Sequence, residues 1–290
     1  MFKNDNIYTG IFIGIVIVFI ITLFIIIYLV NKMKEDMLFN PRKRNMENTL
    51  KIQKYSIDKL LKNKNLTLKN RFVLLGNDKI NINIIKNNKS DKWILYCHGN
   101  SGDVYSCYKC FYKLSTISSI VSFDYRGYGL STNKPSVKNI KEDIICMWYF
   151  LVNNLKIDPQ NIIVLGISLG GAISIYLGEF LTINKQRLPK AIISESSFSS
   201  VIEIAKYRFP LINKLSLFLT KSFDSKKSLS NIDTNIPVII CHSDEDDYIP
   251  ITHAQTLLKS RSNTHFFRLY GEHDKHFVSK KYLNFISSLF

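Results

Sequence analysis

The stretch Gly166-Ile167-Ser168-Leu169-Gly170 decides the fold that this sequence predicts. It follows the apolar run Asn161–Leu165 and precedes the small-residue run Gly171–Leu177, so a buried strand, a tight turn and a helix are expected in succession. The turn would lift the serine off the sheet edge and expose its hydroxyl. The glycines are needed because a side chain there would collide with a neighbouring strand or helix. A glycine-rich turn with an incidental serine is the alternative, and the flanking runs favour a nucleophile.

The remaining pattern predicts an α/β fold with a mostly parallel sheet and helices on both faces. From about Arg71 onward, short and almost wholly apolar strands alternate with helical segments, which is typical of such a sheet. Strands are expected over Arg71–Leu75, Ile80–Ile85, Trp93–Cys97, Ile120–Phe123, Asn161–Leu165, Ala191–Ile193, Val238–Cys241 and Thr264–Leu269. Helices are expected over Val104–Thr116, Val137–Leu155, the segment from the serine turn to Phe180, Ile251–Ser260 and Phe277–Phe290.

One segment interrupts this alternation. Residues 200–236 contain Phe209-Pro210 and a Leu/Phe-rich stretch that ends at Thr220. We interpret the segment as a lid over the site, with an extra helix packed on the sheet as the alternative.

Sites in such sheets collect at the carboxyl ends of the strands, so the loop His98–Asp103 after one of them is informative. In acyl transfer this loop gives one backbone N–H to the oxyanion, and the residue after the nucleophile gives the other. We predict Asn100 and Leu169 as these donors, with Gly99 allowing close approach. His98 precedes the glycine, so we expect it to anchor the loop by a hydrogen bond; the alternative is that it is the base.

The general base must reach Ser168 from another strand end. Gly271–His276 follows the last expected strand and contains two histidines. We favour His273, which lies close to the strand-end glycine, over His276, which would already enter the final helix. The other candidate histidines fall in an expected helix or at a strand start and are assigned structural or surface roles: His253 and His265.

An acid is needed to orient the imidazole and to stabilise its charged form. The loop His242–Pro250 contains Asp244, Glu245, Asp246 and Asp247, and spacing does not choose among them. The chain order serine, acid, histidine is the one expected for this sheet. Glu195, after the preceding strand, is a reserve candidate.

The N-terminal region predicts a membrane anchor. Residues 7–30 contain no charged side chain, and a helix of this length spans roughly 36 Å, enough for a hydrocarbon core of about 30 Å. The run is too long for a cleaved signal peptide, and no A-x-A-like site follows it. We therefore expect a single-pass protein of the plasma membrane or an endomembrane.

The distribution of charge along the chain predicts its partners and its orientation in the membrane. Residues 31–69 carry a disproportionate share of the net charge of +16 and form a basic juxtamembrane segment that is expected to attract anionic lipid. A solvated, lysine-biased surface is the alternative explanation for much of the excess charge. More Lys and Arg follow the span than precede it, which favours a cytoplasmic C-terminal domain. Nucleic-acid binding is not expected, because aromatic interleaving, finger spacing and a helix-turn-helix pattern are all missing from the sequence.

Cysteine usage predicts neither a disulfide framework nor a metal. The five cysteines are odd in number, and Cys107-Tyr108-Lys109-Cys110 has no second pair that would complete a zinc site. We expect no cofactor.

In its motifs the chain resembles the α/β-hydrolase superfamily, and within it the membrane-anchored bud-emergence branch, which includes α/β-hydrolase domain-containing protein thirteen. The resemblance runs from about Phe72 to the C-terminus. It is carried by H-G-N-S-G-D at 98–103, D-Y-R-G-Y-G-L-S at 124–131, G-I-S-L-G-G-A at 166–172, E-S-S-F-S-S at 195–200, D-D-Y-I-P at 246–250 and G-E-H-D at 271–274.

The resemblance implies an α/β-hydrolase fold and a choice of acid. The family pattern D-x-x-[VI]-P corresponds to Asp246, and G-x-H corresponds to His273. Members of this branch also carry an N-terminal span, and some are thought to face away from the cytoplasm, which conflicts with the charge count here.

We therefore expect a transmembrane anchor at 7–30, a basic segment at 31–69 and an α/β-hydrolase domain at 70–290. The expected function is a membrane-anchored serine hydrolase with Ser168, His273 and Asp246 as catalytic residues. Its substrate is an ester or thioester, and location suggests a lipid-derived or S-acyl group. A serine peptidase of the same fold and a non-catalytic membrane scaffold are the alternatives.

Overall fold

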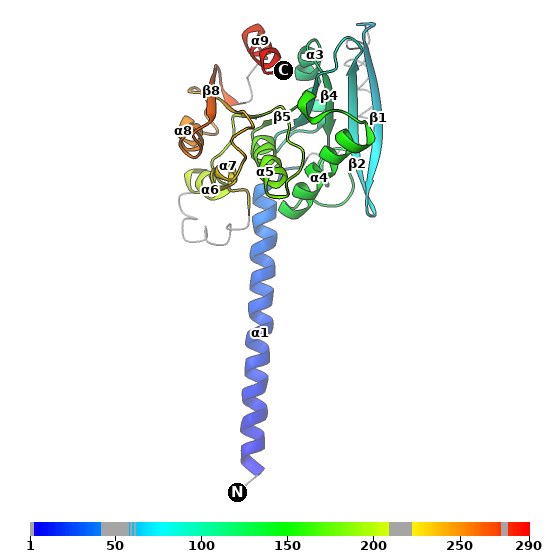
Figure 1. Ribbon diagram of the computed structural model, residues 1–290. Coiled ribbons are helices and arrows are strands. Elements are labelled where there is room, and N and C mark those ends of the chain that lie inside the picture. The colour runs from blue at the N-terminus through cyan, green and yellow to red at the C-terminus, as the bar shows by residue number, and fades with distance from the viewer. Residues whose placement is uncertain (1–2, 42–57, 59, 61, 209–221, 274–277) are drawn as a thin grey trace.

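The computed structural model describes residues 3–41, 58, 60, 62–208, 222–273 and 278–290. A long N-terminal helix, α1 (Lys3–Leu38), projects from an α/β domain (Figure 1). Among the described residues α1 is the one helix long and apolar enough to cross a membrane, and its stretch Ile11–Leu29 has a mean hydropathy of 3.3 and no buried part. The helix extends beyond the expected span and continues to the domain.

The domain is built on one sheet, which in the described part of the chain has the strand order β1-β2-β4-β3-β5-β6-β7-β8. The first two strands form an antiparallel hairpin that pairs antiparallel to β4, and all other pairs are parallel. The strands are β1 (Leu66–Leu75), β2 (Asp78–Asn87), β3 (Trp93–Cys97), β4 (Ser119–Phe123), β5 (Ile162–Ile167), β6 (Ala191–Glu195), β7 (Val238–Ser243) and β8 (Thr264–Leu269).

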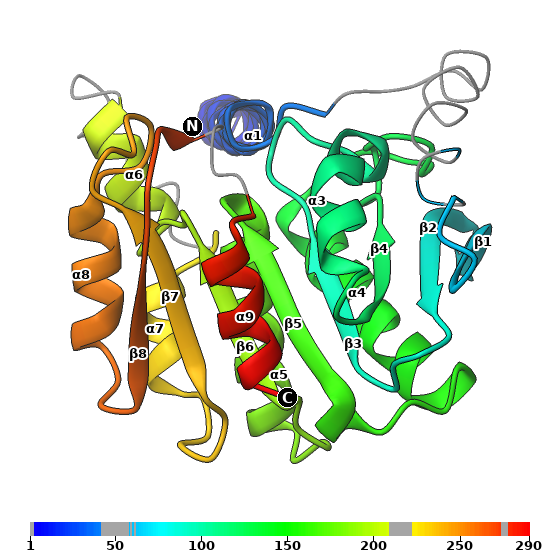
Figure 2. The ribbon, with the colours of Figure 1, turned by 90° about the horizontal axis from the view of Figure 1, so that it is seen from above.

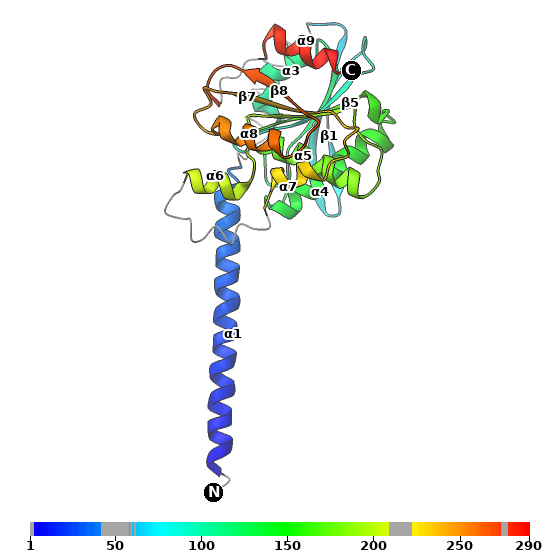
Figure 3. The same ribbon diagram turned by 60° about the vertical axis from the view of Figure 1, so that its left-hand side comes forward.

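Two apolar layers cover the sheet. Figures 1 and 3 show α3 and α9 on the face away from the free end of α1, and α4, α5, α7 and α8 on the opposite face. The helical elements are η1 (Val104–Cys107), α3 (Tyr108–Leu114), α4 (Val137–Tyr149), the π-helical turn η2 (Phe150–Asn154), η3 (Pro159–Asn161), α5 (Leu169–Ile183), α6 (Val201–Arg208), α7 (Ser225–Ser230), α8 (Ile251–Lys259) and α9 (Lys280–Ser288).

The central strands are apolar throughout because both of their faces are buried. In β3, Trp93, Leu95 and Cys97 belong to one buried cluster, and Ile94 and Tyr96 belong to the other. This is the period-2 alternation of side chains across a sheet that is covered on both sides. The sequence-based expectation of an α/β fold with a mostly parallel sheet is confirmed.

The hairpin differs from its expected bounds. Its register runs from Leu66 opposite Asn87 to Leu75 opposite Asp78, so both strands are longer than expected. Much of β1 is exposed, and the polar residues of its first half face solvent at the sheet edge. A mostly exposed strand with polar residues is harder to recognise in a sequence than a buried apolar run. The sheet therefore begins within the segment that was assigned to the juxtamembrane region.

The expected lid segment contains α6 and α7. The Leu/Phe-rich stretch between them falls in 209–221, outside the described residues, as do 42–57, 59 and 61 of the basic segment. The interpretation of residues 200–236 as a lid stays a prediction.

Candidate active site

Ser168 lies in the turn between β5 and α5. Its backbone has φ 56° and ψ −117°, in the left-handed region that side chains rarely adopt. A Cβ added at Gly166 would come 1.9 Å from the carbonyl oxygen of Gly170, and one at Gly170 would come 2.1 Å from that of Cys97. The prediction that these glycines are needed for close approach is confirmed. The strand, the turn and the helix pack so tightly here that they hold the Ser168 backbone in this rarely adopted conformation.

The imidazole of His273 lies within hydrogen-bond distance of both of the other side chains predicted to be catalytic, Ser168 and Asp246. His273 Nε2 is 3.2 Å from Ser168 Oγ, and His273 Nδ1 is 2.9 Å from Asp246 Oδ2. Each residue follows a different parallel strand, β5, β7 or β8, so their loops meet at one edge of the sheet. The arrangement is a hydroxyl, an imidazole and a carboxylate in series.

Backbone donors hold the carboxylate of Asp246. Its Oδ1 accepts hydrogen bonds from the N–H groups of Tyr248, at 3.0 Å, and Ile249, at 2.8 Å. The residue is buried. Charge-assisted bonds of this kind favour the ionised carboxylate and fix its direction. These bonds orient the Asp246 carboxylate toward the imidazole of His273.

The other carboxylates have different partners. Asp244 is exposed and pairs with Arg268 of β8. Asp247 Oδ1 accepts a bond from the backbone N–H of His273 at 3.2 Å, and Glu195, the reserve candidate, accepts one from the Tyr282 hydroxyl at 2.8 Å. Among the carboxylates of the β7 loop, Asp246 is the buried one.

Of the other histidine candidates, the structure describes His98, His253 and His265. His98 is buried, and its Nδ1 lies 2.8 Å from the carbonyl oxygen of Gly99, so the prediction that it anchors the loop is confirmed. Burial lowers the pKa of His98 and of His253. His253 contacts the Ser199 hydroxyl at 2.7 Å, His265 lies in β8, and His276 lies outside the described residues.

The loop after β3 lies against the serine. A Cβ at Gly99 would be 3.5 Å from the Cβ of Ser168. Within the described residues, no acceptor is bonded to the backbone N–H of Asn100 or of Leu169. The Asn100 side chain is occupied, because its Oδ1 accepts a bond from the Tyr128 hydroxyl at 2.7 Å. One predicted donor thus follows Gly99, which lies against the serine, and the other follows Ser168 itself in the chain.

Two tyrosines support this loop, and sequence reasoning did not single them out. Tyr125 donates from its hydroxyl to the carbonyl oxygen of His98 at 2.8 Å, in addition to the bond from Tyr128 to Asn100. Both tyrosines belong to the motif D-Y-R-G-Y-G-L-S after β4. Their position at a strand end next to β3 is the signal that could have pointed to them.

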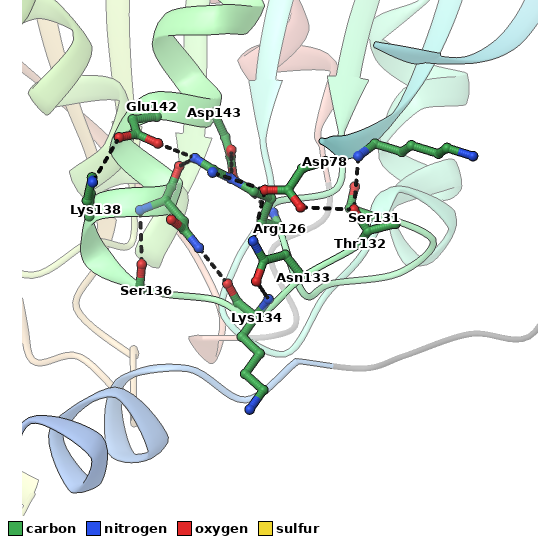
Figure 4. Close-up of polar contacts among 12 residues, drawn as sticks. Asp78, Arg126, Ser131, Thr132, Asn133, Lys134, Ser136, Lys138, Glu142 and Asp143 are labelled. Atoms are coloured by element: carbon green, nitrogen blue, oxygen red, sulfur yellow. Dashed lines mark hydrogen bonds and ion pairs between the residues drawn. The ribbon is translucent and has the colours of Figure 1, made fainter. Parts of the chain in front are cut away.

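An ion cluster holds the turn that carries these tyrosines (Figure 4). Arg126 contacts Asp143 at 2.6 Å, Glu142 at 2.7 Å and Asp78 at 3.3 Å. The cluster joins the β1–β2 hairpin turn to α4. Burial raises the pKa of Asp143 to about 6, although Arg126 acts against the rise.

Residues at the rim of the site also escaped sequence reasoning. The ring of Tyr248 lies 5.2 Å from that of His273 at an angle of 38°, and the Arg208 guanidinium lies 4.3 Å over the Tyr248 ring. Tyr248 is in the acidic loop, whereas no local pattern marks Arg208. The aromatic ring thus lies beside the imidazole, and the cation lies over the aromatic ring.

The described residues hold no group of three or more His, Cys, Asp or Glu arranged for a metal ion. What the site offers is a hydroxyl next to an imidazole, a fixed carboxylate and two open N–H groups. These are the parts that a nucleophilic acyl transfer requires.

Comparison with known proteins identifies relatives. A family model described as the alpha/beta hydrolase fold matches residues 92–215. The uncharacterized protein R595 of Acanthamoeba polyphaga mimivirus is 30% identical over 222 residues, which are 71% of this chain and 75% of that protein. Human alpha/beta hydrolase domain-containing protein 17B is 30% identical over 207 residues, covering 66% of this chain and 67% of the relative.

Other matches extend this picture. The uncharacterized membrane protein YNL320W of Saccharomyces cerevisiae is 25% identical over 224 residues, 74% of this chain and 77% of its own length. The chain spans 48% of protein 17C of Xenopus tropicalis, about half of its length. Among solved structures, an alpha-beta hydrolase from Vibrio vulnificus superposes with a TM-score of 0.70 at 16% identity, over 87% of this chain and 97% of the other.

Proposed function

This chain belongs to the α/β-hydrolase superfamily, and we propose that it is a membrane-anchored serine hydrolase that cleaves an ester or thioester through an acyl-enzyme. One observation carries the proposal: His273 Nε2 lies 3.2 Å from Ser168 Oγ while its Nδ1 lies 2.9 Å from Asp246. A base within reach of the hydroxyl and an acid behind the base are the arrangement that activates a serine.

In the proposed reaction Ser168 Oγ attacks the carbonyl carbon, and His273 Nε2 takes the hydroxyl proton. Asp246 holds the imidazolium that forms. The N–H groups of Asn100 and Leu169 donate to the oxyanion, which carries the charge that develops in the transition state. Collapse of the tetrahedral intermediate expels the alcohol or thiol, which takes the proton from His273. Water, deprotonated by the same imidazole, then releases the acid.

The proposed membrane anchor favours a lipid-derived or S-acyl substrate. The helical stretch from Leu29 to Leu38 rises about 14 Å, so a domain carried by this anchor stays near the bilayer surface. An acyl chain embedded in that bilayer would reach the site without leaving the membrane region. The basic segment 31–69 supports attraction to anionic lipid, and a yeast relative is named a membrane protein. The six motifs support a place in the bud-emergence branch.

A fluorophosphonate probe tests the nucleophile. The full-length protein in detergent should be labelled, and Ser168→Ala should lose both labelling and hydrolysis of a p-nitrophenyl ester, by roughly 10³-fold or more. Ser288→Ala, an exposed serine at the end of α9, is the matched control and should be labelled like the wild type.

Two outcomes would contradict the proposal. Labelling that persists in Ser168→Ala would show that another residue is the nucleophile. A wild-type protein that is neither labelled nor active on any ester or thioester would favour the membrane scaffold instead.

A further inference from the structure

The membrane helix does not end in a free tether. The residue after α1, Phe39, is 4% exposed and belongs to the same buried cluster as Tyr128 and Leu169. Its N–H donates to the Glu35 carbonyl at 2.9 Å, which continues the helical pattern of hydrogen bonds into the domain. Figure 2, a view along α1, shows the helix at the edge of the sheet where the parallel strands end. The anchor is therefore packed into the domain next to the candidate site.

The next residue bonds to the loop that lies against Ser168. The backbone N–H of Asn40 donates to Asn100 Oδ1 at 3.0 Å, the same oxygen that accepts the Tyr128 hydroxyl at 2.7 Å. Burial raises the pKa of Tyr128, and the Asn40 N–H acts to lower it, so the three groups form one small polar cluster. One donor on Asn100 thus comes from the anchor and the other from the domain.

This contact fixes the residue that we assigned as an oxyanion donor. The loop is held at His98 by Tyr125 and at Asn100 by Tyr128 and Asn40. A donor N–H contributes fully only when it lies about 2.7–3.1 Å from the position of the oxyanion, and a misplacement of about 1 Å can cost as much as 10²-fold in rate. Loss of one of these hydrogen bonds would let the Asn100 backbone move away from that position.

We propose that the end of the membrane helix is a positioning element of the active site. Packing of Phe39 in the core brings the Asn40 N–H to the Asn100 side chain, and this contact holds the Asn100 backbone against Ser168. The inference rests on the proposed hydrolase function. It implies that the docked anchor sets the rate of acyl transfer even for a small soluble ester that does not need the bilayer.

Three substitutions, two at Phe39 just after α1 and one at Phe24 within it, test the proposal. Phe39→Ala removes the buried ring, whereas Phe24→Ala removes an identical ring that is 69% exposed within the apolar stretch of α1. In the full-length protein, kcat for p-nitrophenyl acetate should fall about tenfold or more in Phe39→Ala, with KM changed less than twofold. Phe24→Ala should keep the wild-type kcat, and Phe39→Leu should recover most of it. Equal kcat values for Phe39→Ala and Phe24→Ala would overturn the proposal.

A double-mutant cycle separates positioning from a general loss of stability. Asn100→Ala keeps the backbone N–H but removes the oxygen that Asn40 and Tyr128 contact. If both changes act on one contact, the combined variant Phe39→Ala/Asn100→Ala should be little slower than the slower single variant. Effects on kcat that multiply would overturn the proposal.

Failure of this proposal and failure of the hydrolase function give different results. A wild type that is not labelled by fluorophosphonate and hydrolyses nothing overturns both. A wild type that is labelled and active, together with an unimpaired Phe39→Ala, overturns the positioning role alone.

Discussion

At the scale of single residues, burial distinguishes one acid from its neighbours. Asp246 accepts two backbone hydrogen bonds and contacts His273 Nδ1, whereas Asp244 is exposed and pairs with Arg268. An amide in place of the Asp246 carboxylate would present N–H groups to N–H donors or reverse the hydrogen bond to the imidazole. Either result disfavours the tautomer that accepts the serine proton.

Asp246→Asn is therefore expected to lower kcat by roughly 10³–10⁴-fold, the size of effect seen when a buried triad acid is neutralised. Asp244→Asn, a change of the same chemistry two residues away, should alter kcat less than about twofold, because an exposed ion pair contributes little. Hydrolysis of a soluble ester by both purified variants is the measurement. Equal losses would contradict the assignment of Asp246.

Sequence reasoning reached the residues that a local motif marks. Ser168, Asp246 and His273 each stand at a strand end, and parallel strands bring their loops to one edge. The choice among four carboxylates needed a family pattern, because spacing does not reveal which side chain is buried. Tyr248 and Arg208 could not be predicted, since their contacts depend on where distant loops fold.

At the scale of elements, the Arg126 cluster ties three separate parts of the domain together. Its partners come from the hairpin turn at Asp78 and from α4 at Glu142 and Asp143 (Figure 4). Arg126 follows Tyr125 in the turn that supports the loop beside Ser168. The cluster therefore links the edge of the sheet to the site.

We predict that Arg126→Met lowers the free energy of unfolding by about 3–5 kcal/mol at pH 7.5, because it leaves the buried Asp143 carboxylate without its cation. Burial already raises the folded-state pKa of Asp143 to about 6, above an unfolded value of about 3.9, so its contribution to stability is lost as the pH rises through the folded pKa. Without Arg126 this pKa rises further, and the variant should regain much of the loss at pH 5, where Asp143 is protonated.

Denaturant unfolding followed by the fluorescence of the buried Trp93 and Trp148 measures this effect at both pH values. Lys138→Met is the matched control, since Lys138 is exposed and its contact with Glu142 is 3.9 Å long. It should change stability by less than about 0.5 kcal/mol. An Arg126→Met penalty that is the same at pH 5 and pH 7.5 would contradict the role given to Asp143.

The elements themselves were predictable where burial is complete. β3, β5 and β7 are apolar on both faces, so their runs stand out in the sequence. The first half of β1 was missed because solvent covers it and polar residues are tolerated there. The expected helix over Val137–Leu155 changes at Phe150 into a π-helical turn, a departure that periodicity does not detect.

At the scale of the whole molecule, the division into an N-terminal helix and an α/β domain follows from composition. The way in which the helix end packs against the domain does not. A charge-free run of this length predicts a separate helix, and the structure has α1 projecting from the domain (Figure 1). The sequence analysis places Phe39 and Asn40 in the basic juxtamembrane segment. Their docking depends on the loop at Asn100, sixty positions away along the chain, and no local signal reports such a contact.

The distribution of basic residues predicts the side of the membrane on which the domain lies. More basic residues follow the span than precede it, among them Lys32 and Lys34, which favours a cytoplasmic domain. Asn88-Lys89-Ser90 fits the glycosylation pattern, and Asn88 is exposed just after β2, so a translocated domain would offer this acceptor to the glycosylation machinery. In sealed microsomes we expect protease to digest the domain without detergent, and Asn88→Gln to migrate on gels like the wild type. Protection from protease, or a glycan that Asn88→Gln removes, would contradict the charge count and place Ser168 on the opposite side of the membrane.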